Sequence, residues 1–203
     1  MNLRTLDAET VRDAILCASG CLDPKLGGPP VAITKPGHGL SKVDAAPGSA
    51  QRLIGPKSEI TLATGPGEEF RRSLYLFARR NYPLKFLVIF DAPLMAVNST
   101  LRGSSATVLQ SLALLHSEFV LDRAARMAKR VRSGLPAGDQ TACIASAFTL
   151  TFSRPPTEEE QELAAAFLER QQAIHGDSED AQSKALADFC HMLISSNGFI
   201  HID

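Results

Sequence analysis

The sequence contains no tryptophan, and aromatic side chains make up only 6% of its 203 residues. Stacking of bases on exposed rings, which single-stranded nucleic-acid binders use, is therefore not expected. An excess of charge is also missing, because 21 lysines and arginines are balanced by 22 aspartates and glutamates. Since nucleic-acid binders need a basic excess to displace counterions from phosphates, this balance predicts no nucleic-acid partner.

Long hydrophobic runs are absent as well. The longest dense apolar run is 86–90, between Lys85 and Asp91, far short of the roughly 20 residues that cross a bilayer. Residues 1–9 have no apolar core of the kind found in secretory signals. We therefore expect no membrane span and, from this sequence taken by itself, a cytoplasmic location; a piece of a longer exported protein would share these features.

Four cysteines, Cys17, Cys21, Cys143 and Cys190, are too scattered for a zinc site, which needs two close pairs of cysteine or histidine. The sequence Cys-x-x-Cys-His, which attaches haem covalently, does not occur. The five histidines include no pair at helical i, i+4 spacing. We predict no metal and no cofactor in this chain.

The hydrophobic periodicity predicts a mainly α fold in a single domain spanning 1–203. A helix is expected over 5–22 with Asp7 as its cap. From 104 to 203, helical stretches joined by short connectors predict an antiparallel bundle. Its first helix is expected to be capped by Ser104 or Ser105 and to bury an apolar stripe. A later helix, which starts after Thr157, is expected to bury three apolar side chains. The stripe consists of Val108, Leu112, Leu115 and Phe119, and the later side chains are Leu163, Phe167 and Leu168.

Between these helical parts, residues 23–69 are rich in glycine and proline and predict a loop region. Two short β-like runs in it, 31–34 and 59–64, predict a small β-hairpin. In 70–103, two short helices are expected, the first with Leu74, Phe77 and Ala78 on one face and the second over 84–90, where a strand is the alternative.

One cluster of polar residues lies in the irregular link between apolar elements, where buried polar groups must satisfy one another. Both a structural network and a binding site fit this pattern. The cluster consists of Asp91, Asn98, Thr100, Arg102 and Gln110.

A second candidate is a basic helix face with Arg123, Arg126 and Arg130. Cations near a helix C-terminus are stabilised by the helix dipole, so a solvated face explains them without a ligand. Binding of an anionic polymer is the functional alternative.

Several motifs together resemble one family, the planctomycete-type secreted domain of unknown function 1553. They are the segments 71–76, 90–93, 98–102, 110–115, 154–160, 185–191 and 196–203. The resemblance implies that this chain is the C-terminal part of a larger exported protein, behind a cytochrome-c-like haem domain and a further domain. Exported or periplasmic localisation would follow, with haem bound upstream of this chain. The resemblance identifies no catalytic residues in this chain.

From these observations, we expect a non-catalytic helical interaction module within a larger exported, haem- or polysaccharide-associated protein. Its partners would be upstream domains of the same protein or a homologous chain. The alternative is an enzyme domain acting on complex carbohydrate, with a polar pocket around Asp91 and Arg102. Because the family's domain extends upstream, the helix at 5–22 is expected to leave apolar surface uncovered and to cause self-association.

Overall fold

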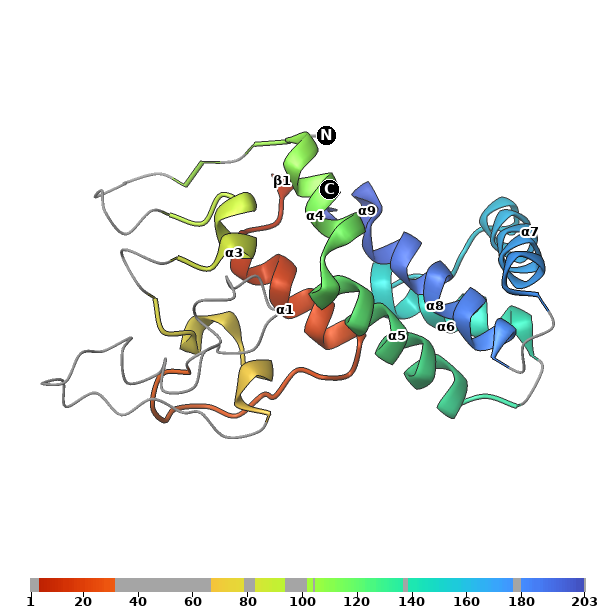
Figure 1. Cartoon of the computed structure of the whole chain (residues 1–203), viewed down its shortest axis with the longest axis horizontal. Coiled ribbons are helices and arrows are strands. Elements are labelled where there is room, and N and C mark those ends of the chain that lie inside the picture. The colour runs from red at the N-terminus through yellow and green to blue at the C-terminus, as the bar shows by residue number, and fades with distance from the viewer. Residues whose placement is uncertain are drawn as a thin grey trace, which may run out of the picture.

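The structure is a computed structural model, and the prediction of a mainly helical fold is confirmed (Figure 1). It describes residues 4–31, 67–78, 83–93, 102–103, 105–136, 139–176 and 180–202. One end of the molecule contains α1, α3 and two single-turn helices, and the other end contains the packed helices α5 to α8 (Figure 1).

The first end is built around α1 (Ala8–Ala18), which begins after Asp7 as predicted. The helix stops four residues before the expected end, because Gly20 has a positive φ of 71° and turns the chain away. The 3-10 helix η2 (Ser73–Tyr75) and the short helix α3 (Lys85–Ile89) pack against α1. A second 3-10 helix, η1 (Glu68–Phe70), is hydrogen-bonded to α1 through Arg12.

The second end begins with α4 (Val108–His116) and α5 (Glu118–Ser133). It continues with α6 (Gln140–Phe152), α7 (Glu158–His175), α8 (Ala181–Ile194) and α9 (Asn197–Ile200). The start of α7 is fixed by a reciprocal capping box, in which Thr157 and Glu160 each bond the other's backbone N–H. Packing is most extensive where α8 lies between α5 and α7, and this part forms the predicted helical bundle.

One hydrophobic cluster runs through both ends of the molecule. Its fully buried members include Val11 and Ile15 of α1, Met127 of α5, and Phe189 and Ile194 of α8. The apolar face of α1 is therefore covered, and the expectation that this helix would leave apolar surface exposed is wrong. Within the part of the chain that the structure describes, no helix is both long enough and apolar enough to cross a membrane.

The sheet consists of β1 (Arg4–Thr5) and β2 (His201–Ile202), which pair antiparallel with Thr5 opposite His201. The pairing continues into the next residue, because the backbone N–H of Leu6 donates to the carbonyl of Ile200 over 2.9 Å. The predicted hairpin of 31–34 with 59–64 lies outside the described residues except for Val31, which forms a parallel bridge with Leu76.

Several local predictions need correction. The segment with Leu74 and Phe77 is not an α-helix but the 3-10 turn η2 followed by extended chain, because it is held by side chains from α1. The segment 84–90, in contrast, contains the helix that was preferred over a strand. The cap of α4 is Thr107 rather than Ser104 or Ser105, and Thr107 forms a capping box with Gln110.

Most of the apolar stripe predicted for the first helix of the bundle is also not buried, and its one buried member, Phe119, lies in α5. Val108, Leu112 and Leu115 are 75%, 43% and 47% exposed, whereas Gln110 and Leu114 are the buried residues of this helix. The physical reason is that α4 contacts α3 and α5 through its Gln110 and Leu114 side, which turns the predicted stripe to solvent. In α7, Leu168 is buried as expected, but Leu163 is 65% exposed.

Candidate functional site

The most unusual side chain is Arg12 of α1, which is charged and only 3% exposed. Its Nη2 donates to the carbonyl of Glu69 over 2.6 Å, and its Nη1 donates to the carbonyl of Arg71 and to the Ser73 hydroxyl, each over 3.1 Å. Burial lowers the pKa of Arg12 to about 10, although the neighbouring carboxylate of Asp13 acts in the opposite direction. Arg12 therefore stays charged at neutral pH and fastens η1 and η2 to α1.

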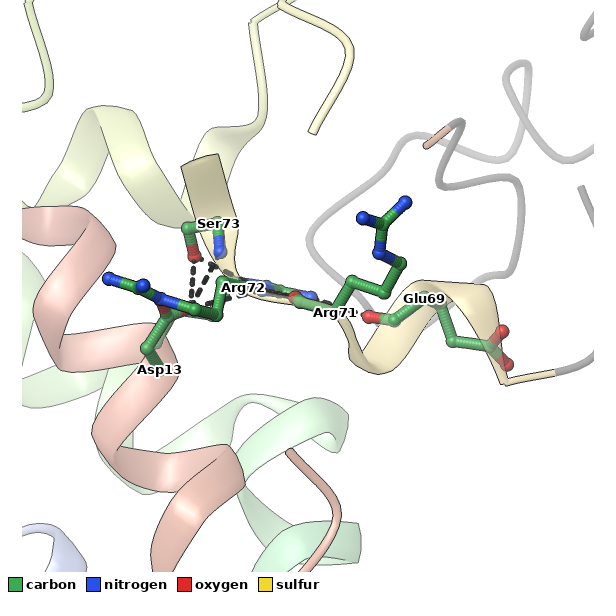
Figure 2. Close-up of polar contacts among 6 residues, drawn as sticks. Asp13, Glu69, Arg71, Arg72 and Ser73 are labelled. Atoms are coloured by element: carbon green, nitrogen blue, oxygen red, sulfur yellow. Dashed lines mark hydrogen bonds and ion pairs between the residues drawn. The ribbon is translucent and has the colours of Figure 1, made fainter. Parts of the chain in front are cut away.

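Asp13 adds a second connection from the same helix (Figure 2). Its Oδ1 accepts hydrogen bonds from the backbone N–H of Ser73 over 2.8 Å and from the Ser73 hydroxyl over 2.7 Å. Its Oδ2 lies 3.9 Å from Nε of Arg72. Arg12 and Asp13 thus both bind the segment 69–73, which follows about sixty residues later in the sequence.

Arg71 is buried completely and extends in the opposite direction from Arg72 (Figure 2). Its guanidinium donates to the carbonyls of Pro29, Lys25 and Gly27 and lies 4.1 Å from the centre of the Tyr75 ring. The two neighbouring arginines of the motif 71–76 therefore have different partners. Arg71 bonds the segment 25–29, and Arg72 faces Asp13 of α1.

The three arginines of the predicted basic face do not form one exposed face. Arg123 is 1% exposed, and its guanidinium lies 4.7 Å from the centre of the Phe70 ring. Arg130 donates to the carbonyls of Cys17 and Ala18, where it binds the C-terminal end of α1. Arg126 and Arg130 are both exposed, and Nε of Arg126 lies 3.7 Å from the Asp122 carboxylate one turn earlier. Arg123 therefore belongs to the core, whereas Arg126 and Arg130 remain at the surface one turn apart, and Arg130 is engaged by α1.

The predicted polar cluster separates into two parts. Asp91, which has a positive φ of 62°, accepts bonds from the backbone N–H and the hydroxyl of Ser105, both over 2.6 Å. Gln110 donates to the same carboxylate over 3.4 Å and to the carbonyl of Ile89 over 3.1 Å. Asp91 and Gln110 thus join the end of α3 to the start of α4, and their polar atoms face each other rather than a ligand.

Arg102 lies elsewhere, in contact with the first turn of α1. Its two terminal nitrogens bond both carboxylate oxygens of Glu9, over 2.7 and 3.3 Å. Burial raises the pKa of Glu9, but the hydrogen bond from Arg102, a backbone hydrogen bond and the charge of Arg102 together outweigh this effect, and the net pKa is lowered. Asn98 and Thr100, the other members of the predicted cluster, lie outside the described residues.

A cleft of about 500 Å³ lies between α1, η2 and α3, and Arg102 is at its edge. Its charged wall contains Glu9, Asp13 and Arg72, and its other wall is largely apolar, with Leu84 and Leu87 of α3 among its residues. A third carboxylate, Asp7, lines the cleft as well. All three belong to α1 or its N-cap, so they are not opposed across a substrate as in glycoside hydrolysis, where two carboxyl groups flank the bond. Glu9 and Asp13 are bonded by arginine or serine side chains, and Asp7 lies 3.9 Å from Arg102.

The described residues contain no group of three or more histidine, cysteine, aspartate or glutamate side chains placed to hold a metal ion. Cys17 is exposed in α1, whereas Cys21 follows the end of that helix, so the two do not share a helical face. Burial raises the pKa of Cys190 to about 12, which makes this thiol chemically unreactive at neutral pH.

Comparison with known families gives a match to a family model described as "Protein of unknown function (DUF1553)", which aligns with residues 1–168. The chain belongs to this DUF1553 family. The match includes Arg12, Arg71 and Arg72, here named the arginine cluster, as well as the Asp91–Gln110 connection and the helices up to the buried Leu168 of α7. No curated protein and no solved structure gives a significant match.

Sequence reasoning did not identify Arg12, Asp13 and Ser73 as a cluster in this DUF1553 chain. The segment 71–76 was noted for its resemblance to the family, but its partners on α1 have no local sequence signal. The sequence gives no signal because Arg12 bonds two backbone carbonyls, and every residue type has such an acceptor.

Proposed function

We propose that the chain is a non-catalytic helical interaction module, acting within a larger exported protein that is associated with haem or polysaccharide. The resemblance to the secreted family supports the wider setting, including haem bound in a domain upstream. The main support for the interaction role is an exposed apolar surface on α4, here named the α4 ridge. It consists of Val108, Leu109, Leu112 and Leu115, which are 75%, 65%, 43% and 47% exposed.

The α4 ridge differs from ordinary surface leucines because its members are adjacent. Residues three and four apart in a helix lie next to each other, so Val108, Leu112 and Leu115 form one continuous row. The sequence of α4 contains no lysine, arginine, aspartate or glutamate. Contiguous apolar patches on soluble proteins mark sites where another surface docks.

The polar contacts also favour binding over catalysis. Asp13, Glu9 and Asp91 each accept hydrogen bonds from groups that hold two elements of the fold together. These bonds occupy the carboxylates in holding the fold together, whereas a general acid or base must be able to exchange its proton with a substrate.

A second candidate function is an enzyme acting on complex carbohydrate. Only the cleft beside Arg102 favours it, since Asp91 does not line this cleft. Equilibrium binding and turnover assays with a panel of plant and algal polysaccharides test it. Turnover that is lost in Arg102→Ala, with an unchanged melting temperature, would establish the enzyme and overturn the interaction module.

The interaction role is tested with a fluorescent dye that reports on exposed apolar surface. At concentrations low enough for the chain to be monomeric, the native chain is expected to enhance the fluorescence, and the double variant Leu112→Asp with Leu115→Asp is expected to lose most of it. Leu26→Asp is the matched control, because Leu26 is 77% exposed and does not belong to the α4 ridge. Equal fluorescence from all three proteins would contradict the proposal.

A further inference from the structure

Beside the α4 ridge lies a groove on the outer side of α8, here named the α8 groove, with a volume of about 640 Å³. Residues of α8 form its floor, and α4 and α7 contribute its sides. It is lined by Leu115, Phe167, Gln171, Asp188, His191, Met192, Ser195 and Ser196.

The ridge and the groove are continuous, because Leu115 is both the last residue of the ridge and part of the groove lining. The groove also has apolar contacts to offer, since Met192 is 39% exposed and Phe167 is only partly buried. Further along α7, Leu163 and Ile174 are 65% and 67% exposed and extend the apolar surface. The molecule thus presents a protruding apolar row and a recess on one continuous surface.

We infer that this surface binds a second copy of the chain, with the α4 ridge of each copy lying in the α8 groove of the other. This inference rests on the proposed function and names its partner. A two-fold interface requires one surface that is complementary to itself, so that each contact occurs twice. A ridge next to a groove meets this requirement, and Leu115, which belongs to both, would lie close to the two-fold axis.

The area and the charges favour a second copy over a short peptide. A stable interface buries about 800 Å² on each partner, more than one short helix row supplies, so ridge, groove and the neighbouring part of α7 are needed together. The ridge has no charged side chain, and Asp188 in the groove is already bonded to His175 over 2.6 Å. Joining two copies therefore buries no unpaired like charges, and the formal net charge of −1 causes little repulsion at long range.

The test is sedimentation velocity of the whole chain over a range of concentrations, with Leu112→Asp as the ridge variant and Met192→Lys as the groove variant. The native chain is expected to dimerise, and each variant alone is expected to dissociate at least about tenfold more readily, because both copies of its contact are damaged. Leu26→Asp is expected to dimerise like the native chain.

A mixture of the two variants gives the sharpest evidence. One of its two contacts is native, and the other brings the carboxylate introduced on the ridge next to the ammonium group introduced in the groove, so the mixture is expected to dimerise again. Circular dichroism melts of the separate variants show that each is folded. A mixture that stays monomeric, or a dimer that persists in both variants, would overturn the ridge-in-groove arrangement.

The dye experiment separates this inference from the proposed function. A native chain that stays monomeric at every concentration, with dye binding that is lost in Leu112→Asp, would overturn the second copy and leave the interaction role intact. A monomer with no dye binding would contradict both.

Discussion

Replacing Arg12 by alanine tests whether the buried arginine cluster holds the two 3-10 helices on α1. The substitution removes the donor from three buried acceptors, the carbonyls of Glu69 and Arg71 and the hydroxyl of Ser73. Breaking a buried, charged network by removing one partner costs about 3–5 kcal/mol. A domain is stable by roughly 5–15 kcal/mol in total, so this is a large part of its free energy of unfolding.

The assay is urea unfolding followed by circular dichroism, together with the melting temperature. For a chain of this size, the melting temperature falls by roughly 2–4 °C for each kcal/mol, so Arg12→Ala is expected to lower it by about 10 °C. Arg12→Lys keeps the charge but cannot span three acceptors, and its melting temperature is expected to fall between those of the native chain and Arg12→Ala. The control is Arg102→Ala, which removes an ion pair with Glu9 that is about half exposed and is expected to cost no more than about 1 kcal/mol.

A loss below about 1 kcal/mol for Arg12→Ala would refute this reasoning, because it would show that water replaces the guanidinium without cost. A loss as large for Arg102→Ala would refute it too, since burial would then not distinguish the two arginines.

Three further features are open to test. Asp91→Ala removes the acceptor that joins the end of α3 to the start of α4 and is expected to cost about 1–3 kcal/mol, read from the melting temperature; an unchanged value would show that this connection is not structural. The bond from Arg154 lowers the pKa of Glu160 to about 2 from 4.5, so the stability it contributes is complete above pH 4.5 and is lost as the pH falls towards 2. Between these pH values the native chain is expected to lose more stability than Glu160→Gln, and parallel acid-unfolding curves would contradict this. A thiol reagent is expected to label the exposed Cys17 rapidly and Cys190 only after unfolding, and rapid labelling of Cys190 in the folded chain, located by peptide mass spectrometry, would contradict the assignment.

The helix boundaries that could be predicted from the sequence are those determined by neighbouring residues. Thr157 and Glu160 satisfy each other's backbone groups within one turn, and the spacing alone reveals them. The arginine cluster could not be predicted in this way, because Arg12 bonds backbone atoms of residues 57 and 59 positions away. Nothing in the local sequence of either segment specifies that pairing.

The orientation of α4 shows a different limit. Its sequence places apolar residues on every side, so periodicity identifies a stripe but does not decide which side is buried. The deciding residue is Gln110, a polar side chain that is 3% exposed because it bonds the carbonyl of Ile89 and the Asp91 carboxylate. The polar residue therefore lies inside and the leucines outside, the reverse of what hydrophobicity alone predicts.

The pairing of β1 with β2 has a consequence for the order in which the chain is made. The two strands lie side by side in the fold (Figure 1), yet almost the whole sequence separates them. At about 5–20 residues per second, roughly 10–40 s pass on the ribosome between the synthesis of one strand and the other. During most of that time α8 is missing as well, and α5 lacks the helix that covers it. A ribosome that stalls before α8 therefore carries a nascent chain with an open strand edge and an uncovered helix face, a form that proteases and chaperones recognise.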